Sequence, residues 1–143
     1  MDIEEIIENF EFLDDWDDRY KYLIELGSML DALPESDRTR ENKVQGCVSQ
    51  VWVTSQKSAD TDPVLHFSGA SDAHIVSGLI AITFAIFSGK PASEILAVDE
   101  REIFNRIHLS EHITPQRSNG LRSLVERIKT DAKLATARPV ASS

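Results

Sequence analysis

The stretch DAHIVSGLIAITFAIFS, residues 72–88, decides the fold of this chain. It is apolar on nearly every side, which predicts a helix that is the central and most buried element of the protein. Before it, VWVT at 51–54 and VLHF at 64–67 are rich in β-branched and aromatic residues, and the polar segment between them is typical of a hairpin loop. A hairpin followed by an apolar helix predicts a small antiparallel sheet packed against helices.

Two amphipathic helices are expected before the hairpin. Apolar residues spaced i, i+3, i+4 and i+7 predict the first, which begins at about Ile3. The second is expected from about Asp15 to Leu33, because Pro34 cannot continue a helix and disfavours helical backbone in the residue before it. Its predicted inward face consists of Trp16, Tyr20, Leu23, Ile24, Gly27 and Leu30.

Three further helices are expected after the central one. Two short helices are predicted near 91–97 and 99–107, and a long one begins with Pro115 at its first position. The order of helices, small sheet and helices indicates an α+β fold. The chain has 143 residues. We expect one domain over 1–136 and a flexible tail at 137–143.

The net charge of −9 comes from one end of the chain. Residues 1–18 hold nine acidic side chains and no basic one, and the rest of the chain is neutral. Because phosphates would be repelled, this balance argues against general binding to nucleic acid or to an anionic membrane. The most apolar run, residues 75–89, is too short to span a bilayer, and the acidic start lacks the basic region of a targeting peptide. We therefore expect a cytoplasmic protein.

Cys47 is the single cysteine of the sequence. One cysteine cannot form an internal disulfide, a CxxC redox pair or a four-thiolate metal site. Free cysteines are commonly buried structural residues, and that interpretation stays open. However, Cys47 follows Gly46 where a polar loop meets a strand, and such a position can present a thiol at the surface. A thiol there becomes reactive when its pKa is lowered.

Ordinary thiol catalysis is neither excluded nor supported by the residues. A cysteine protease needs a histidine base with an orienting partner, and none of the four histidines lies in a protease-like sequence. Residues 44–46 lack the Thr or Pro that a thiol peroxidase normally carries before its cysteine. His108 and His112 have the i, i+4 spacing of a metal pair, but Pro115 breaks the helix at once. We interpret both histidines as exposed or capping side chains.

Asp72 and Arg117 both have simple structural explanations. Asp72 begins the central helix, where the helix dipole favours an acid, and Ser71 can cap that helix. Arg117 lies in the first turn of the last helix, where a cation is mildly unfavourable. That small cost is a hint that Arg117 faces an anion elsewhere.

Four segments, taken together, resemble the SufE family of sulfur acceptor proteins. In chain order they are YLIELG (22–27), KVQGCVSQVW (43–52), SDAHIVSGL (71–79) and TPQRSNGL (114–121). The resemblance covers about residues 3–132, and four ordered motifs are far more specific than one cysteine. Departures are small: Val48 stands where the family often has Gln, and Ser77 where a basic residue is usual.

The resemblance implies a fold of the SufE/IscU kind, a three-stranded antiparallel sheet with helices packed on one side. It would make Val44 and its neighbours a short additional strand. It also implies that Cys47 accepts sulfane sulfur from a SufS-like cysteine desulfurase as a persulfide. Cys47 would then pass the sulfur to an iron–sulfur cluster scaffold by thiol exchange. The pyridoxal phosphate is expected only in the desulfurase, so this chain would need no cofactor and no metal of its own.

The resemblance further implies roles for residues around the cysteine. Loop or partner-binding roles fall on Gln45, Gly46, Ser49, Asp72 and Arg117. Arg117 would stabilise a thiolate or persulfide anion, and Asp72 would hold the loop or the partner, with their capping and surface interpretations still open. We expect the desulfurase to dock around 43–52, 71–77 and 117–120, with the acidic segment peripheral.

Two other functions stay open beside this one. The first is a non-catalytic binding module of the same fold with an idle thiol. The second is a relay like CsdE, a paralogue of SufE, which serves a different desulfurase. An iron–sulfur scaffold of the IscU kind is disfavoured, because such scaffolds use several cysteine ligands and this chain has one.

Overall fold

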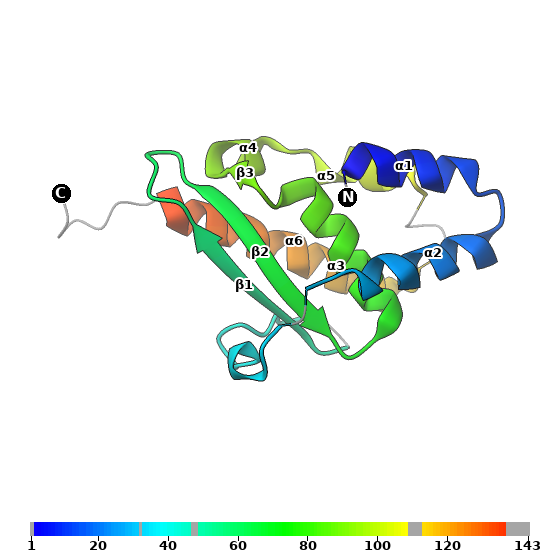
Figure 1. Cartoon of the computed structure of the whole chain (residues 1–143), viewed down its shortest axis with the longest axis horizontal. Coiled ribbons are helices and arrows are strands. Elements are labelled where there is room, and N and C mark those ends of the chain that lie inside the picture. Colours follow the sequence, from blue (N-terminus) through cyan, green and yellow to red (C-terminus); the bar gives the residue numbers. More distant parts are fainter. Residues whose placement is uncertain (1, 32, 47–48, 109–112, 137–143) are drawn as a thin grey trace.

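The computed structural model describes residues 2–31, 33–46, 49–108 and 113–136 (Figure 1). Cys47, Val48, His112 and the expected tail at 137–143 lie outside the described residues. In chain order the elements are α1 (Ile3–Phe12), α2 (Trp16–Ser28), the 3-10 turn η1 (Glu35–Asp37), β1 (Val51–Lys57), β2 (Val64–Ser71), α3 (His74–Phe87), β3 (Lys90–Pro91), α4 (Ala92–Ala97), α5 (Glu100–Arg106) and α6 (Pro115–Thr136). The predicted α+β class is confirmed.

The sheet has three antiparallel strands in the order β1-β2-β3. Val53 and Leu65 are fully buried, whereas His66 between two buried neighbours on β2 is exposed. This alternation places one face of the sheet against the helices and leaves the other toward solvent. The third strand, β3, pairs with the start of β2 through Val64 with Pro91 and Leu65 with Lys90.

The segment around Val44 is not the additional strand that the resemblance implied. It makes one isolated bridge, between Lys43 and Trp52. The Val44 N–H donates to the Val51 carbonyl, and the Val53 N–H donates to the Asn42 carbonyl, each at 2.8 Å. The pairing goes no further because a turn precedes Lys43 and Gly46, with a φ of 87°, redirects the chain after it.

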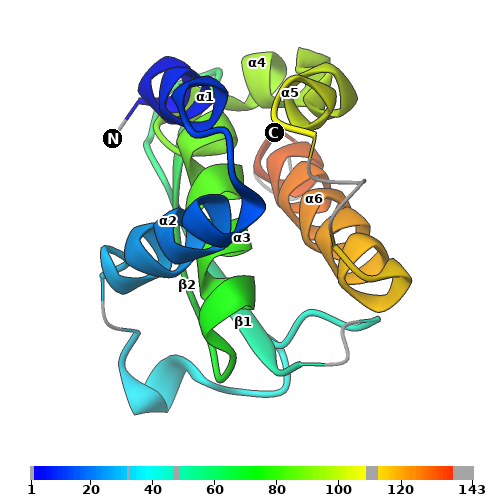
Figure 2. The same cartoon turned by 90° about the vertical axis from the view of Figure 1, so that its right-hand side faces the viewer.

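The helix α3 is the buried centre of the fold, as predicted (Figure 2). It lies between α2 and α6 and also packs on β2. Its one buried polar side chain, Thr83, donates its hydroxyl to the Leu79 carbonyl at 2.7 Å, so no unsatisfied group is buried there. The helix begins at His74, later than expected. Ser71 does not cap it, because the Ser71 hydroxyl accepts from the N–H of Ala73, which has extended backbone.

The prediction for α2 is wrong in two respects. The helix ends at Ser28, not Leu33, because the N–H of Met29 turns to the Leu26 carbonyl, three residues back. Ile24, expected inward, is 42% exposed, and Leu26 is buried in its place. The cause is a close crossing with α3: a Cβ at Gly78 would lie 2.1 Å from the Leu23 carbonyl oxygen.

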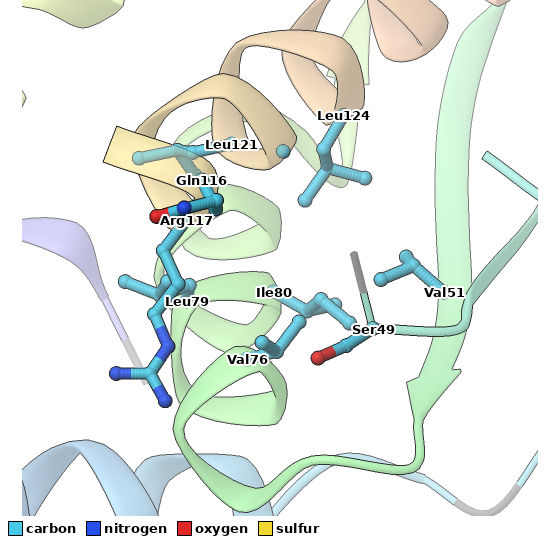
Figure 3. A pocket seen from close by; sticks show the side chains of 10 residues that line it. Ser49, Val51, Val76, Leu79, Ile80, Gln116, Arg117, Leu121 and Leu124 are labelled. Atoms are coloured by element: carbon cyan, nitrogen blue, oxygen red, sulfur yellow. The ribbon is translucent and has the colours of Figure 1, made fainter. Parts of the chain in front are cut away.

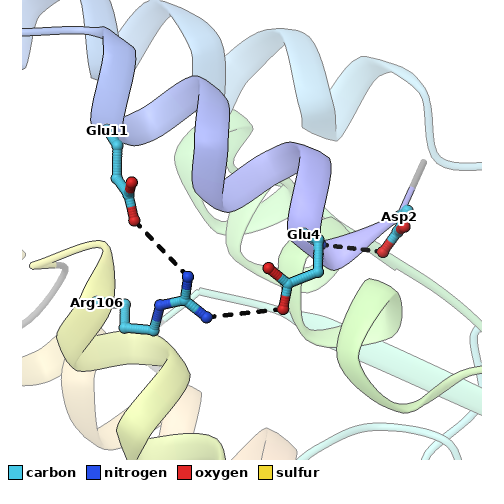
Figure 4. Close-up of polar contacts among 4 residues, drawn as sticks. All are labelled: Asp2, Glu4, Glu11 and Arg106. Atoms are coloured by element: carbon cyan, nitrogen blue, oxygen red, sulfur yellow. Dashed lines mark hydrogen bonds and ion pairs between the residues drawn. The ribbon is translucent and has the colours of Figure 1, made fainter.

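The remaining helices follow the predictions. The inward residues of α1 (Ile6, Ile7 and Phe10) and of α6 (Leu121, Leu124, Val125 and Ile128) are buried. His108 follows α5 with a φ of 56°, so no helix carries it. Arg106 of α5 lies between two acids of α1, 3.6 Å from Glu4 and 3.8 Å from Glu11 (Figure 4). Within the described residues, no helix has the length and apolarity needed to cross a membrane.

Candidate functional site

A small apolar cavity of about 40 Å³ lies where α3 and α6 meet the segment that enters β1 (Figure 3). Its apolar walls come from Val51, Val76, Leu79, Ile80, Leu121 and Leu124. Ser49, Gln116, Arg117 and Gly120 complete the lining. A cavity of this size has room for a few atoms, since one water needs about 10–15 Å³ by the same measure.

The cysteine segment, defined here as residues 45–50, contacts α6 through Gly46 and reaches the cavity through Ser49. Cys47 and Val48 lie outside the described residues. Before them, Gly46 packs so closely on α6 that a Cβ there would lie 2.6 Å from the Ser123 hydroxyl oxygen. After them, Ser49 lines the cavity, and in Figure 3 its side chain points toward Val76. Gln45 is exposed.

Asp72 binds the backbone of Gln50, at the end of the cysteine segment. Its Oδ1 accepts a hydrogen bond from the backbone N–H of Gln50 at 3.1 Å, across 22 residues of sequence. Asp72 does not cap α3, because Ala73 is the N-cap residue and no side chain caps that helix end. The carboxylate therefore joins the entry of β1 to the start of α3.

Arg117 stands at the rim of the cavity in the first turn of α6. Its backbone N–H donates to the Thr114 hydroxyl at 3.2 Å, so Thr114 caps this helix end. Its side chain is exposed and runs past Leu79, with the guanidinium turned away from Leu124 (Figure 3). Among the described residues the guanidinium makes no ion pair. It is thus available to an anion at the mouth of an apolar space.

The structure brings together four of the predicted site residues. Ser49 and Arg117 line one cavity, Gly46 packs on the helix that forms its wall, and Asp72 holds the residue next to Ser49. Sequence reasoning missed the apolar walls and Ser123. Four wall residues fall within quoted motifs, which was the available signal: Val51, Val76, Leu79 and Leu121. Ser123 falls in none of the motifs.

The fold and site define a small α+β domain in which Ser49, two residues after the single cysteine, lines an apolar cavity. Residues 4–132 match the SufE family model, described as an Fe-S metabolism associated domain. The chain therefore belongs to the SufE family. Family membership implies a sulfur-transfer role, with a cysteine desulfurase, in Fe–S metabolism.

Two curated relatives agree with this assignment. An uncharacterized SufE-like protein of Rhizobium meliloti is 57% identical over 132 residues, which are 92% of this chain and 94% of that protein. A second, from Rhizobium etli, is 57% identical over 136 residues, which are 94% of this chain and 92% of that protein.

A solved structure shares the fold. It is the solution structure of a hypothetical protein from Thermus thermophilus, with a TM-score of 0.74 over 93% of this chain and 94% of that chain. At 18% sequence identity, this likeness concerns the arrangement of helices and strands.

Proposed function

We propose that this chain accepts sulfur from a SufS-like cysteine desulfurase and activates that enzyme. Cys47 carries the sulfur as a persulfide and passes it to an iron–sulfur cluster scaffold complex. The observation that supports this most is that Ser49 and Arg117 line one apolar cavity. Ser49 follows the one cysteine of this SufE-family chain by two residues.

The transfer is a thiol exchange. The Cys47 thiolate attacks the outer sulfur of the persulfide on the desulfurase, and a new S–S bond forms as the old one breaks. The desulfurase cysteine leaves with the electron pair as a thiolate and takes up a proton in place of the one that Cys47 gave up. No electrons are gained or lost overall, so the step needs no oxidant. The pyridoxal phosphate chemistry that frees sulfur from cysteine stays in the partner.

Arg117 and the cavity have complementary parts in this proposal. A guanidinium without an ion pair in the described chain is suited to stabilise a thiolate or persulfide anion at the cavity mouth. The apolar walls limit contact with water and oxidants, to which a persulfide is sensitive. Asp72 accepts a hydrogen bond from Gln50 and so fixes the end of the cysteine segment to the start of α3.

The desulfurase docks, in this proposal, on the surface around 43–52, 71–77 and 117–120. These ranges meet at the cavity and at the Asp72–Gln50 bond. The acidic helix α1 lies at the opposite end of the molecule from the segment that enters β1 (Figure 2). Charges on that helix should therefore affect the rate of encounter more than the final affinity.

The cellular setting follows from the chemistry. A persulfide relay starts from a reduced thiol, which a reducing compartment maintains, so we place the protein in the cytoplasm. A relay of the CsdE kind would use the same step with another desulfurase and acceptor. A binding module with an idle thiol would use the same surface without the step.

An activation assay separates the sulfur acceptor from the binding module. The rate of sulfide release by a SufS-like desulfurase is measured with the wild-type chain, Cys47→Ser, Arg117→Ala and Arg122→Ala. Arg122 is the matched control, because it is an exposed arginine on α6 that does not line the cavity. We expect Cys47→Ser to abolish activation, Arg117→Ala to reduce it about tenfold and Arg122→Ala to leave it unchanged. Full activation by Cys47→Ser would show a binding module.

A further inference from the structure

A groove between α5 and α6 takes no part in the proposed function. Its volume is about 620 Å³, which lies within the range of sites that bind ligands or partner side chains. Half-buried Phe104 of α5 and buried Val125 of α6 give it an apolar floor. Among the described lining residues, only Leu121 belongs both to this groove and to the cavity beside Ser49. The groove is therefore a separate recess on another side of α6.

The groove has a positive rim where the start of α5 meets the second half of α6. Arg101, Lys129 and Lys133 line it there. Lys129 is already neutralised, because its Nζ lies 3.1 Å from the Glu100 carboxylate. Arg101 and Lys133 are exposed and make no ion pair among the described residues, and Glu126 is the one unpaired acid of this rim. The chain that joins α5 to α6, which includes the undescribed residues 109–112, leaves from the other end of α5.

The outer face of α1 carries an aromatic residue among acids. Phe12 is 85% exposed, and it follows Glu8 by four residues and Glu5 by seven. Residues three or four apart are neighbours on a helix, so these three side chains form one stripe opposite the buried face of α1. Within the described chain, neither acid of this α1 stripe makes an ion pair.

The α1 stripe and the groove are complementary. The helix α1 has four acidic and no basic side chains, whereas α6 has five basic and two acidic ones. The stripe is about 10 Å long, and the groove from Val125 to Lys133 is about 12 Å long. Figure 2 shows α1 and α6 on opposite sides of α3, so a chain does not fill its own groove with its own stripe.

We propose that the groove binds the α1 stripe of a second copy of this chain, in a head-to-tail contact. Phe12 of one copy packs on Phe104 of the other, since aromatic side chains pair favourably. The two acids of the stripe face Arg101 and Lys133. One helix stripe covers less than the ~800 Å² that each partner contributes to a stable complex, so the association is weak and sensitive to salt.

The test is sedimentation equilibrium over a wide range of protein concentration, with a reductant present so that Cys47 forms no disulfide. A stripe variant carries Phe12→Ser and Glu8→Gln, and a groove variant carries Arg101→Glu and Lys133→Glu. We expect each variant alone to raise the dissociation constant about tenfold or more. An equal mixture of the two should form a one-to-one dimer and nothing larger, because each supplies the surface that the other lacks.

Two control variants match these changes. Leu134→Ser removes another exposed apolar side chain, 66% exposed on α6 and outside the groove lining. Lys21→Glu with Lys57→Glu reverses two exposed charges on α2 and β1. Both should associate as wild type does. Thermal melts show that every variant is folded.

Four results would overturn the proposal. One is a wild-type chain that stays monomeric at millimolar concentration. Another is a groove variant that self-associates as wild type does, which would place the second copy elsewhere. A third is a mixture that stays monomeric. The last is an equal loss in the lysine control, which would assign the effect to net charge. No desulfurase takes part, so these outcomes do not depend on the proposed function.

Discussion

Replacing Gly78 by alanine should destabilise the protein by about 2–3 kcal/mol, although alanine is the better helix former by about 1 kcal/mol. The reason is the crossing of α2 over α3. A Cβ at Gly78 would lie 2.1 Å from the Leu23 carbonyl oxygen, and ordinary contacts begin at 3.4 Å. The two helices would therefore have to separate by about 1 Å, a gap that forfeits a quarter to a half of the dispersion energy across the seam.

The seam that would open is the centre of the core. Leu23, Leu26, Leu79 and Ile80 are all at most 3% exposed. Overpacking of a close-packed site costs about 1–3 kcal/mol and more where backbone atoms collide, which exceeds the gain in helix propensity. Because Leu79 and Ile80 also line the cavity, the same change should lower activation of the desulfurase.

The assay is urea unfolding followed by circular dichroism, with thermal melts beside it. We expect the midpoint of Gly78→Ala to fall by about 10 °C in the melt. Gly27→Ala should cost less, because its Cβ would lie 2.7 Å from the Gly78 nitrogen. Glu25→Ala, on the exposed face of α2, is the control and should change stability by no more than about 0.5 kcal/mol. A Gly78→Ala chain as stable as wild type would refute the close crossing.

Three further predictions concern the surface. Hydrogen bonds from the hydroxyl and the N–H of Ser93 hold the pKa of Asp62 below its ordinary 3.8. This stabilisation is present above the unfolded pKa and is lost as pH falls through the folded pKa. Asp62→Asn should therefore lower the melting temperature at neutral pH, and the difference from wild type should shrink as the pH is lowered through the acid range. An equal loss of melting temperature at neutral and at acid pH would contradict this role of Asp62. Arg106→Ala should lower stability by at most about 1 kcal/mol in low-salt urea titrations, and by less at high salt, because its two acids on α1 are exposed. A loss that salt does not reduce would contradict this. Glu5→Gln with Glu8→Gln, which leaves the Arg106 pairs intact, should barely change desulfurase activation at physiological salt, where the screening length is about 8 Å, and a large loss would place the interface on α1.

The sequence was sufficient for elements with a strong period. The apolar run of α3 predicted the central helix, and the β-rich runs of the hairpin predicted the sheet. Burial on all sides of a helix, or on one face of a strand, produces a recognisable pattern of apolar residues in the sequence. The two-residue strand β3 has no room for such a pattern. Its place is fixed by backbone pairing with Val64 and Leu65.

The orientation of α2 could not be predicted from composition. Apolar residues occur on more than one side of that helix, so both Ile24 and Leu26 were candidates for the core. The choice is made by Gly27 and Gly78, which bring the backbones close and turn Leu26 inward. The face of α2 that packs inward is known only once its crossing with α3 is seen.

The site was predicted in part, for a similar reason. The motifs pointed to Ser49, Asp72 and Arg117, but not to what each side chain touches. The cavity is assembled from three separate segments, and the bond of Asp72 to Gln50 spans 22 residues. Ser123 carries no pattern of its own, because a small residue on a helix becomes informative only when the chain packed against it is known.

The most direct test of the sulfur-acceptor role is the intact mass of the protein after incubation with a SufS-like desulfurase and cysteine. The chain has one cysteine, so a persulfide adds one sulfur atom at a single site. We predict that gain in mass, its loss on treatment with a thiol reductant, and its absence in Cys47→Ser. A wild-type chain that activates the desulfurase but never gains sulfur, or a gain that persists in Cys47→Ser, would contradict the account.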